Sequence, residues 1–293
     1  MNEFKTVGLI GRIGGDNISQ VIERLINYLR KQSIEVLVEE DTASILSHNE
    51  VNAASRERMA EQCELIIVVG GDGSMLAAAR AFAGSAVKLL GINRGRLGFL
   101  TDISPDDVEY RVAEVLEGNY VTEQRTLLYS TLVRNEQIMM SGLALNDVVV
   151  HPGEFVRMIE FELYIEGEFV YRQRSDGLII STPTGSTAYA LSGGGPILHP
   201  KSDAMVLVPL NPHTLTSRPI VVDGSANIRV IISHDNMFNP HVSNDGQTHV
   251  ETKPGDQLNV CLSKKTLALL HPKGYNFYET CRTKLGWGSQ AEK

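Results

Sequence analysis

Short β-branched apolar runs alternate with helical patterns through the first third of this chain. Residues 6–11, 34–38, 65–69 and 87–92 are typical of buried strands. The segment 16–32 carries apolar residues at 18, 21, 22, 25, 26 and 29, the spacing of one helical face. Strands and helices that alternate in this way favour parallel strand pairing with crossover helices. We therefore predict an N-terminal α/β domain with a parallel, doubly wound sheet.

After about Val121 the pattern changes to period-two alternation with frequent turn signals. Residues 159–165 alternate apolar and polar, and Glu166-Gly167 supplies a tight turn into Phe169. Further strands are predicted at 127–133, 138–150, 178–181, 205–209, 228–233 and 257–262. We predict an α/β domain over 1–120, a mostly β domain over 121–270, and a tail at 271–293 that packs back on the first domain. The cleft between the two domains is the expected site, because ligands bind at the carboxyl ends of parallel strands.

Composition narrows the classes of partner. The 293 residues carry a net charge of -8, and the pI is about 5.5, so no basic field attracts nucleic acid or a membrane surface. No apolar run approaches the roughly 18 residues of a membrane span, and no signal peptide is evident. We expect a cytoplasmic protein. The three scattered cysteines indicate reduced thiols, and the eight histidines show no metal-ligand spacing, so no protein metal site is predicted.

The tract 68–76 ends a strand and begins a helix, with Asp72 held among Gly70, Gly71 and Gly73. Glycines allow backbone conformations that a Cβ forbids and allow a substrate to approach the main chain. The N-terminus of the helix predicted over 74–82 favours an anion, phosphate above all. A carboxylate beside such a phosphate site suggests phosphoryl transfer. The alternative is a strand-to-helix turn in which Asp72 only caps the helix.

Three further segments could bind parts of a nucleotide. The tract 174–196 places many small hydroxyls around Tyr189, which suits a nucleobase and a ribose, although a surface loop is the alternative. Asn146-Asp147 at a strand end could hold ribose hydroxyls or merely form a turn. Arg94 and Arg96 lie on a glycine-containing loop, which suits phosphate oxygens or a solvated loop equally.

Familiar nucleotide and nucleophile signatures are missing from the chain. There is no GxxxxGK[ST] motif, Gly11 to Gly15 fails the GxGxxG spacing, and no GxSxG tract occurs. The Gly70–Gly73 turn is therefore the expected phosphate-handling element.

Four tracts together resemble the bacterial NAD kinases (the ATP-NAD kinase family). They occur in this order: GGDGSM at 70–75, GINRGRLGFLTD at 91–102, LNDVVVHPG at 145–153 and RSDGLIISTPTGSTAYALSGGGPILHP at 174–200, with KLGW at 284–287. The GGDG turn alone is also similar to diacylglycerol kinases and phosphofructokinases, whereas TPTGSTAY is far more specific. The resemblance spans nearly the whole chain.

The resemblance implies transfer of the γ-phosphoryl group of ATP to the 2'-hydroxyl of the adenosine ribose of NAD, giving NADP. It implies a divalent cation, Mg²⁺ above all, and a homodimer or homotetramer. Asp72 is implied as the proton acceptor. The implied NAD-binding residues are Asp72, Gly73, Asn146, Asp147, Arg157, Arg174, Asp176, Thr187, Ala188, Tyr189, Ala190, Leu191, Ser192 and Gln247.

The chain departs from the family pattern at two places. Asp147 stands where relatives more often have glutamate, so water could bridge the shorter carboxylate to its ligand. Arg157 stands where relatives often have histidine, which leaves that contact open. Two rival functions also remain open at this point, namely a lipid or sugar kinase that shares GGDG and a non-catalytic sensor of NAD(H). The residues leave ATP and polyphosphate equally possible as donor.

Overall fold

The computed structural model describes all residues except 1–2, 12–17, 47–50, 96–97, 156 and 288–293. The chain divides into two compact units, one formed by residues 1–124 and 267–293 and the other by residues 125–266. Strands β6 (Tyr120–Arg134) and β17 (Gln257–Pro272) each contribute residues to both units.

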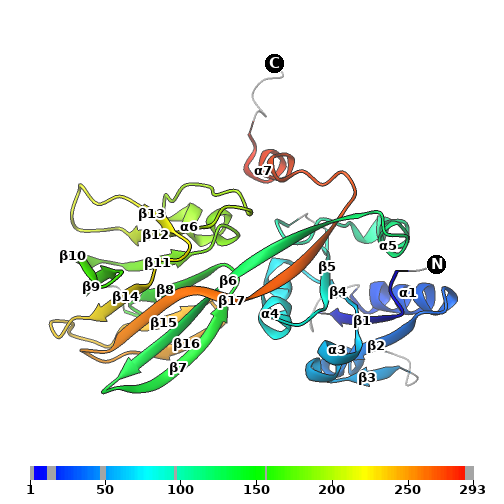
Figure 1. Cartoon of the computed structure of the whole chain (residues 1–293), viewed down its shortest axis with the longest axis horizontal. Coiled ribbons are helices and arrows are strands. Elements are labelled where there is room, and N and C mark those ends of the chain that lie inside the picture. Colours follow the sequence, from blue (N-terminus) through cyan, green and yellow to red (C-terminus); the bar gives the residue numbers. More distant parts are fainter. Residues whose placement is uncertain (1–2, 12–17, 47–50, 96–97, 156, 288–293) are drawn as a thin grey trace. The chain divides into compact units, whose positions relative to one another are not determined.

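The first unit is an α/β layer built on parallel strands (Figure 1). Its strands are β1 (Thr6–Gly11), β2 (Glu35–Glu39), β3 (Asn52–Ala54), β4 (Leu65–Val69) and β5 (Lys88–Ile92). Its helices are α1 (Ile18–Lys31), α2 (Glu40–Ala43), α3 (Arg56–Gln62), α4 (Asp72–Phe82), η1 (Pro105–Asp107), α5 (Val108–Leu116) and α7 (Phe277–Leu285). The strand order is β17-β5-β4-β1-β2-β3, with parallel pairing throughout. The predicted α/β class is confirmed.

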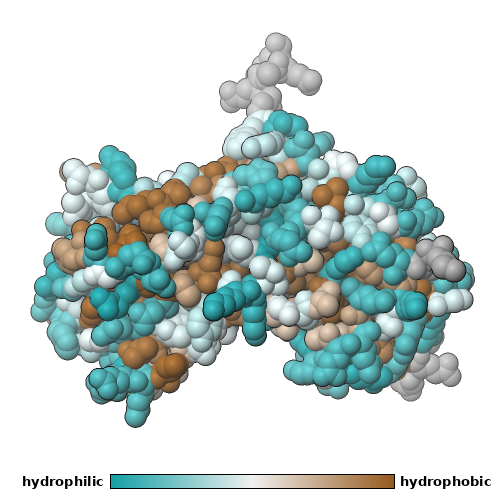
Figure 2. Space-filling model, in the orientation of Figure 1, coloured by the Kyte–Doolittle hydropathy of each residue, from teal (hydrophilic) through white to brown (hydrophobic). Residues whose placement is uncertain are grey.

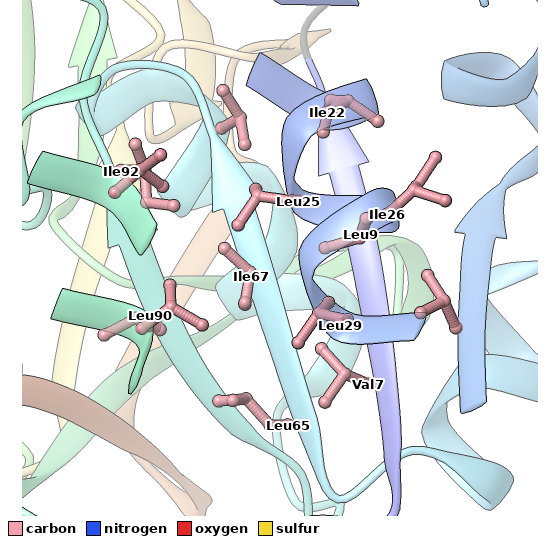
Figure 3. Close-up of a cluster of buried hydrophobic side chains, with 14 of the residues drawn as sticks. Val7, Leu9, Ile22, Leu25, Ile26, Leu29, Leu65, Ile67, Leu90 and Ile92 are labelled. Atoms are coloured by element: carbon pink, nitrogen blue, oxygen red, sulfur yellow. The ribbon is translucent and has the colours of Figure 1, made fainter. Parts of the chain in front are cut away.

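Both faces of this sheet are buried, which is why β4 reads as a continuous apolar run. Leu65 and Ile67 face α1 and α5, whereas Ile66 and Val68 are also fully buried toward the opposite face. Figure 3 shows the α1 side of this core, where side chains of α1 lie on those of β1, β4 and β5. The labelled residues are Val7, Leu9, Ile22, Leu25, Ile26, Leu29, Leu65, Ile67, Leu90 and Ile92. The apolar residues predicted to form one face of α1 are therefore the residues that pack on the sheet.

The second unit consists mainly of antiparallel strands. After β6 these are β7 (Gln137–Ala144), β8 (Asp147–His151), β9 (Ile159–Ile165), β10 (Glu168–Ser175), β11 (Gly177–Ser181), β12 (Ala204–Leu210), β13 (Ile220–Asp223), β14 (Ile228–Ile232), β15 (His241–Asn244) and β16 (Thr248–Glu251). Two short helical turns, η2 (Gly185–Thr187) and α6 (Tyr189–Ser192), follow β11. The mostly β class is confirmed.

Two sheets enclose the core of this unit. One has the order β13-β12-β11-β8-β15-β16, and the other contains β10-β9-β14-β17 with β6 and β7. Side chains of both sheets, among them Val148, Val150 and Phe161, form one apolar cluster. Val149 and Ile179 point to the other face of β8 and β11 and pack in a cluster with Ala190 of α6 and with residues of β12. In Figure 2 hydrophobic residues gather where Figure 1 draws β11, β12 and α6.

The single strand predicted over 138–150 is wrong, because the chain breaks between β7 and β8 at Leu145 and Asn146. The backbone N–H groups of these two residues donate to the carboxylate of Asp245, at 3.0 and 2.7 Å. A side chain therefore takes the place of a neighbouring strand here. Among the described residues, no helix is long and apolar enough to cross a membrane.

Candidate functional site

Asp72 is the first residue of α4, and its carboxylate binds a neighbouring loop. We use the name Asp72 loop for residues 93–95 and 98–102. Oδ2 accepts from the backbone N–H of Phe99 at 3.0 Å, and Oδ1 accepts from the N–H of Leu100 at 3.1 Å and from Thr101 Oγ1 at 3.3 Å. Gly71 is the N-cap of α4, and no side chain caps the helix. The alternative that Asp72 merely caps the helix is therefore wrong.

Glycine is required at position 98 because Asp72 and Gly98 pack closely. A Cβ built on Gly98 would lie 2.0 Å from Asp72 Oδ1 and 2.4 Å from Thr101 Oγ1. Gly71 and Gly73 differ, since a Cβ at either would meet no atom within 4 Å. Gly71 has a φ of -104° and Gly73 is helical, so the prediction that these glycines adopt conformations forbidden to other residues is wrong for both. Their open surroundings leave room for a ligand to approach the main chain.

The second unit contains a cavity of about 890 Å³, which we call the Asn146 pocket. This volume lies within the range of small-molecule and cofactor sites. Its lining residues are Asn146, Asp147, Val149, His151, Pro152, Gly153, Phe155, Arg157, Met158, Asp176, Ala188, Tyr189, Leu210, Asn211, Ser243, Asp245 and Gly246.

Two carboxyl groups meet in the wall of this pocket. The Asp245 carboxylate accepts from the backbone N–H groups of Leu145, Asn146 and Asp147, the last at 3.2 Å. Asp147 is 5% exposed, and its burial, together with the nearby charge of Asp245, raises the pKa of Asp147 to about 7. Near neutral pH, therefore, the Asp147 carboxyl group can donate as well as accept a hydrogen bond.

Asp176 and Tyr189 are two further predicted residues in the wall of the pocket. Asn211 Nδ2 donates to Asp176 Oδ2 at 2.9 Å, and the backbone N–H of Asp176 donates to the Leu210 carbonyl. Tyr189 begins α6, and its side chain is 48% exposed. A half-exposed tyrosine can stack its ring on a flat aromatic group.

The structure brings six of the predicted binding residues to this pocket: Asn146, Asp147, Arg157, Asp176, Ala188 and Tyr189. Five others lie outside its lining: Arg174, Thr187, Leu191, Ser192 and Gln247. Ala190 is fully buried in the apolar cluster of β11 and β12. Arg94 is exposed on the Asp72 loop, and Arg96 lies outside the described residues.

Sequence patterns missed several pocket residues. Phe155 is 54% exposed and its ring centroid lies 4.9 Å from that of Phe238. Asp245 belongs to the second Asn-Asp dipeptide of the chain, and Gly246 follows it. This short pattern was the only local indication that Asp245 lies at the site. His151 stacks on His241 across paired strands, with ring centroids 5.9 Å apart, and burial lowers its pKa.

The two units together define a class of protein. One presents a carboxylate at a helix N-terminus beside glycines, and the other carries a pocket with polar and aromatic walls, as in phosphotransferases that act on nucleotides. Comparison with known proteins makes this class specific. Residues 7–120 match the ATP-NAD kinase N-terminal domain, and residues 145–271 match the ATP-NAD kinase C-terminal domain. The chain belongs to the NAD kinase family, as the resemblance of its motifs predicted.

Two bacterial relatives are similar over nearly the whole chain. An NAD kinase of Saccharophagus degradans is 65% identical over 289 residues, which cover 99% of this chain and 98% of the relative. An NAD kinase of Teredinibacter turnerae is 62% identical over 289 residues, with 99% of each chain covered.

Two solved structures share the fold. The crystal structure of yeast NADH kinase complexed with NADH aligns with a TM-score of 0.89 at 24% identity, and the alignment covers 99% of this chain and 90% of that one. The crystal structure of an NAD kinase from Archaeoglobus fulgidus in complex with ATP aligns with a TM-score of 0.75 at 26% identity, over 95% of this chain and 99% of that one.

Proposed function

We propose that this chain is an NAD kinase that transfers the γ-phosphoryl group of ATP to the 2'-hydroxyl of the adenosine ribose of NAD. The observation that carries the proposal is the geometry of Asp72, a carboxylate oriented by three hydrogen bonds at the N-terminus of α4. Membership of the NAD kinase family supports the choice of acceptor.

Asp72 acts on the ribose hydroxyl as an orienting group and as a late proton acceptor. A carboxylate offers about four lone-pair sites, and the Asp72 loop occupies three of them. The remaining site accepts the hydrogen bond of the ribose 2'-hydroxyl. Phosphoryl transfer passes through a loose transition state, so the nucleophile's proton becomes acidic late and a strong base is not required. Positioning of the hydroxyl is the main contribution of this residue.

The phosphates of the donor bind at the N-terminus of α4. Gly71 and Gly73 leave the main chain open there, and the positive end of the helix dipole favours an anion. Arg94 on the Asp72 loop is a further candidate for phosphate binding, as are Arg96 and the backbone of Gly70. Mg²⁺ enters as part of the substrate MgATP, because Mg²⁺ bound to a nucleotide keeps mainly phosphate and water ligands. Within the described residues no three histidine, cysteine or acidic side chains form a metal-binding group.

The Asn146 pocket binds NAD. Asn146 and Asp147 hold ribose hydroxyls, Tyr189 stacks on a base, and Asp176 accepts hydrogen bonds from the nucleoside. Arg157 lines the same pocket and suits the pyrophosphate. Arg174, Thr187, Ala190, Leu191, Ser192 and Gln247 lie outside the lining, so we assign them supporting roles around the adenosine.

Parallel incubations of the purified chain with ATP and Mg²⁺ test this function. The acceptors are NAD, diacylglycerol and fructose 6-phosphate, and NADP is measured with an NADP-specific dehydrogenase. NADP formed only with NAD supports the proposal, whereas NAD binding without NADP indicates a sensor. A second series replaces ATP with polyphosphate to identify the donor.

Two finer properties complete the proposal. We expect a homodimer or homotetramer, which light scattering during size-exclusion chromatography measures directly. We also expect a cytoplasmic enzyme that binds neither nucleic acid nor membranes, in keeping with its net charge of -8. Fractionation of cells that express the chain tests its location.

A further inference from the structure

A buried histidine lies between two carboxylates in the first unit. His271, at the end of β17, is fully buried. Its Nδ1 lies 2.8 Å from Asp102 Oδ2, and its Nε2 lies 3.5 Å from Glu123 Oε2. The ring of Tyr275 stacks on the imidazole at a centroid distance of 3.7 Å and an interplanar angle of 10°. The imidazole therefore has an acidic side chain at each edge and an aromatic ring on one face.

Asp102 connects this histidine to the Asp72 loop. It directly follows Thr101, whose Oγ1 donates to the Asp72 carboxylate. The backbone N–H of Gly98 donates to the Thr101 carbonyl at 2.8 Å, which closes the loop into a tight turn. The three groups that orient Asp72 therefore lie within three residues of Asp102.

The loop has little room to move independently. A Cβ at Gly91 in β5 would lie 2.4 Å from the Leu100 carbonyl oxygen, so strand and loop are in close contact there. Asn93 Nδ2, at the start of the loop, donates to the carbonyl of Ile103, the residue directly after the loop, at 2.9 Å. Because the loop is packed on one side and closed at its ends, a shift of Asp102 will be transmitted to the Asp72 carboxylate.

We infer that His271 is a positioning residue for phosphoryl transfer, which holds the Asp72 loop through Asp102 and so orients the Asp72 carboxylate. The inference rests on the proposed function, because that function makes Asp72 the proton acceptor. Neither the family motifs nor the spacing of acidic residues indicates this role for His271, which lies 169 residues from Asp102 in sequence.

Two substitutions of His271 separate positioning from packing. Asparagine places its amide nitrogen near the position of Nδ1 and can still donate to Asp102, whereas glutamine places its nitrogen near Nε2 and cannot. We expect His271→Gln to lower kcat about tenfold or more while the KM for NAD changes less than about twofold, since small misplacements of reacting groups are costly. His271→Asn should regain most of the lost kcat.

The link to Asp72 is tested in a second background. If His271 acts through Asp72, His271→Gln causes no further loss of kcat when Asp72→Asn is already present. A full additional loss in this background overturns the inference, and so does equal activity of the glutamine and asparagine variants.

Hydrogen exchange tests the same link without catalysis. We expect the amides of Phe99 and Leu100 to exchange at least about tenfold faster in His271→Gln than in the wild type, with His271→Asn close to wild type. Unchanged exchange in His271→Gln overturns the inference. If the wild-type chain forms no NADP, the proposed function is overturned. The hydrogen-exchange measurement does not depend on catalysis, so it still decides whether His271 holds the Asp72 loop.

Discussion

The carboxyl group of Asp147 is buried beside the carboxylate of Asp245, and burial together with that charge raises the pKa of Asp147 to about 7. Asp245 itself accepts three hydrogen bonds, from the backbone N–H groups of Leu145, Asn146 and Asp147. The Asn146 pocket thus contains two neighbouring carboxyl groups, one of which, that of Asp147, titrates near neutral pH.

This arrangement makes stability depend on pH. Between about pH 4 and 7 Asp147 is protonated in the folded state and ionised in the unfolded chain, so its contribution to stability is lost as the pH rises through about 7. We expect Asp147→Asn to gain stability relative to wild type as the pH rises. The difference in unfolding free energy, variant minus wild type, should be at least about 1 kcal/mol larger at pH 8, where the variant is the more stable protein, than at pH 4. Urea unfolding of the ligand-free proteins at several pH values measures this difference. If the unfolding free energies of the two proteins change with pH in parallel, the raised pKa of Asp147 is contradicted.

Asp72→Asn tests the division between binding and catalysis. The amide cannot accept a proton, and its NH₂ group would face the N–H of Phe99 or Leu100, so we expect kcat to fall about 10²- to 10⁴-fold. Most of the residues that we propose to bind NAD line the Asn146 pocket in the other unit, so calorimetry should find NAD affinity within about twofold of wild type. An equal loss of affinity and turnover would make Asp72 a binding or structural residue.

Two glycine substitutions form a matched pair. Gly98→Ala places a methyl group 2.0 Å from Asp72 Oδ1 and should displace the carboxylate, with a large loss of kcat and a stability cost of about 1–3 kcal/mol. Gly71→Ala meets no atom within 4 Å and should leave stability unchanged within about 0.5 kcal/mol. If phosphates approach the main chain at Gly71, the KM for ATP rises in that variant while the KM for NAD does not. Thermal unfolding measures the change in stability, and steady-state kinetics measures kcat and the two KM values.

Tyr189 provides a test of stacking in the Asn146 pocket. Its ring is half exposed, and base stacking on an aromatic side chain contributes about 1–3 kcal/mol. Tyr189→Ala should therefore weaken NAD binding at least about fivefold, whereas Tyr189→Phe should bind nearly as well as wild type. Fluorescence titration with NAD compares the three proteins. Unchanged affinity in the alanine variant rules out the stacking role.

Local patterns predicted the regular elements well where one face or both faces of an element are buried. The predicted bounds of β1 and β4 agree with the structure, because burial on both faces produces a continuous apolar run. The apolar spacing of α1 matches its buried residues for the same reason. The prediction failed between β7 and β8, where Asp245 binds the backbone of residues 145–147 from about 100 positions away.

The candidate site was only partly predictable. Asn146, Asp147 and Tyr189 stand in recognisable tracts and do line the pocket, whereas Ala190 in the same tract is buried in the core. A residue in a tract of small side chains can face either side of a short helix, and only packing decides which. Phe155 and Asn211 lie outside the recognised tracts, so no pattern indicated them.

The sequence by itself determined the two fold classes, the order of most elements and membership of the NAD kinase family, because periodicity and motifs are local properties of the chain. Tertiary structure decided the orientation and the protonation of the chemical groups at the site. The bonds from the Asp72 loop to Asp72, from Asp245 to Asp147 and from His271 to Asp102 join residues 27 to 169 positions apart. Burial and hydrogen bonding between such distant residues arise only when the chain folds, and they set the orientation of Asp72 and the pKa of Asp147.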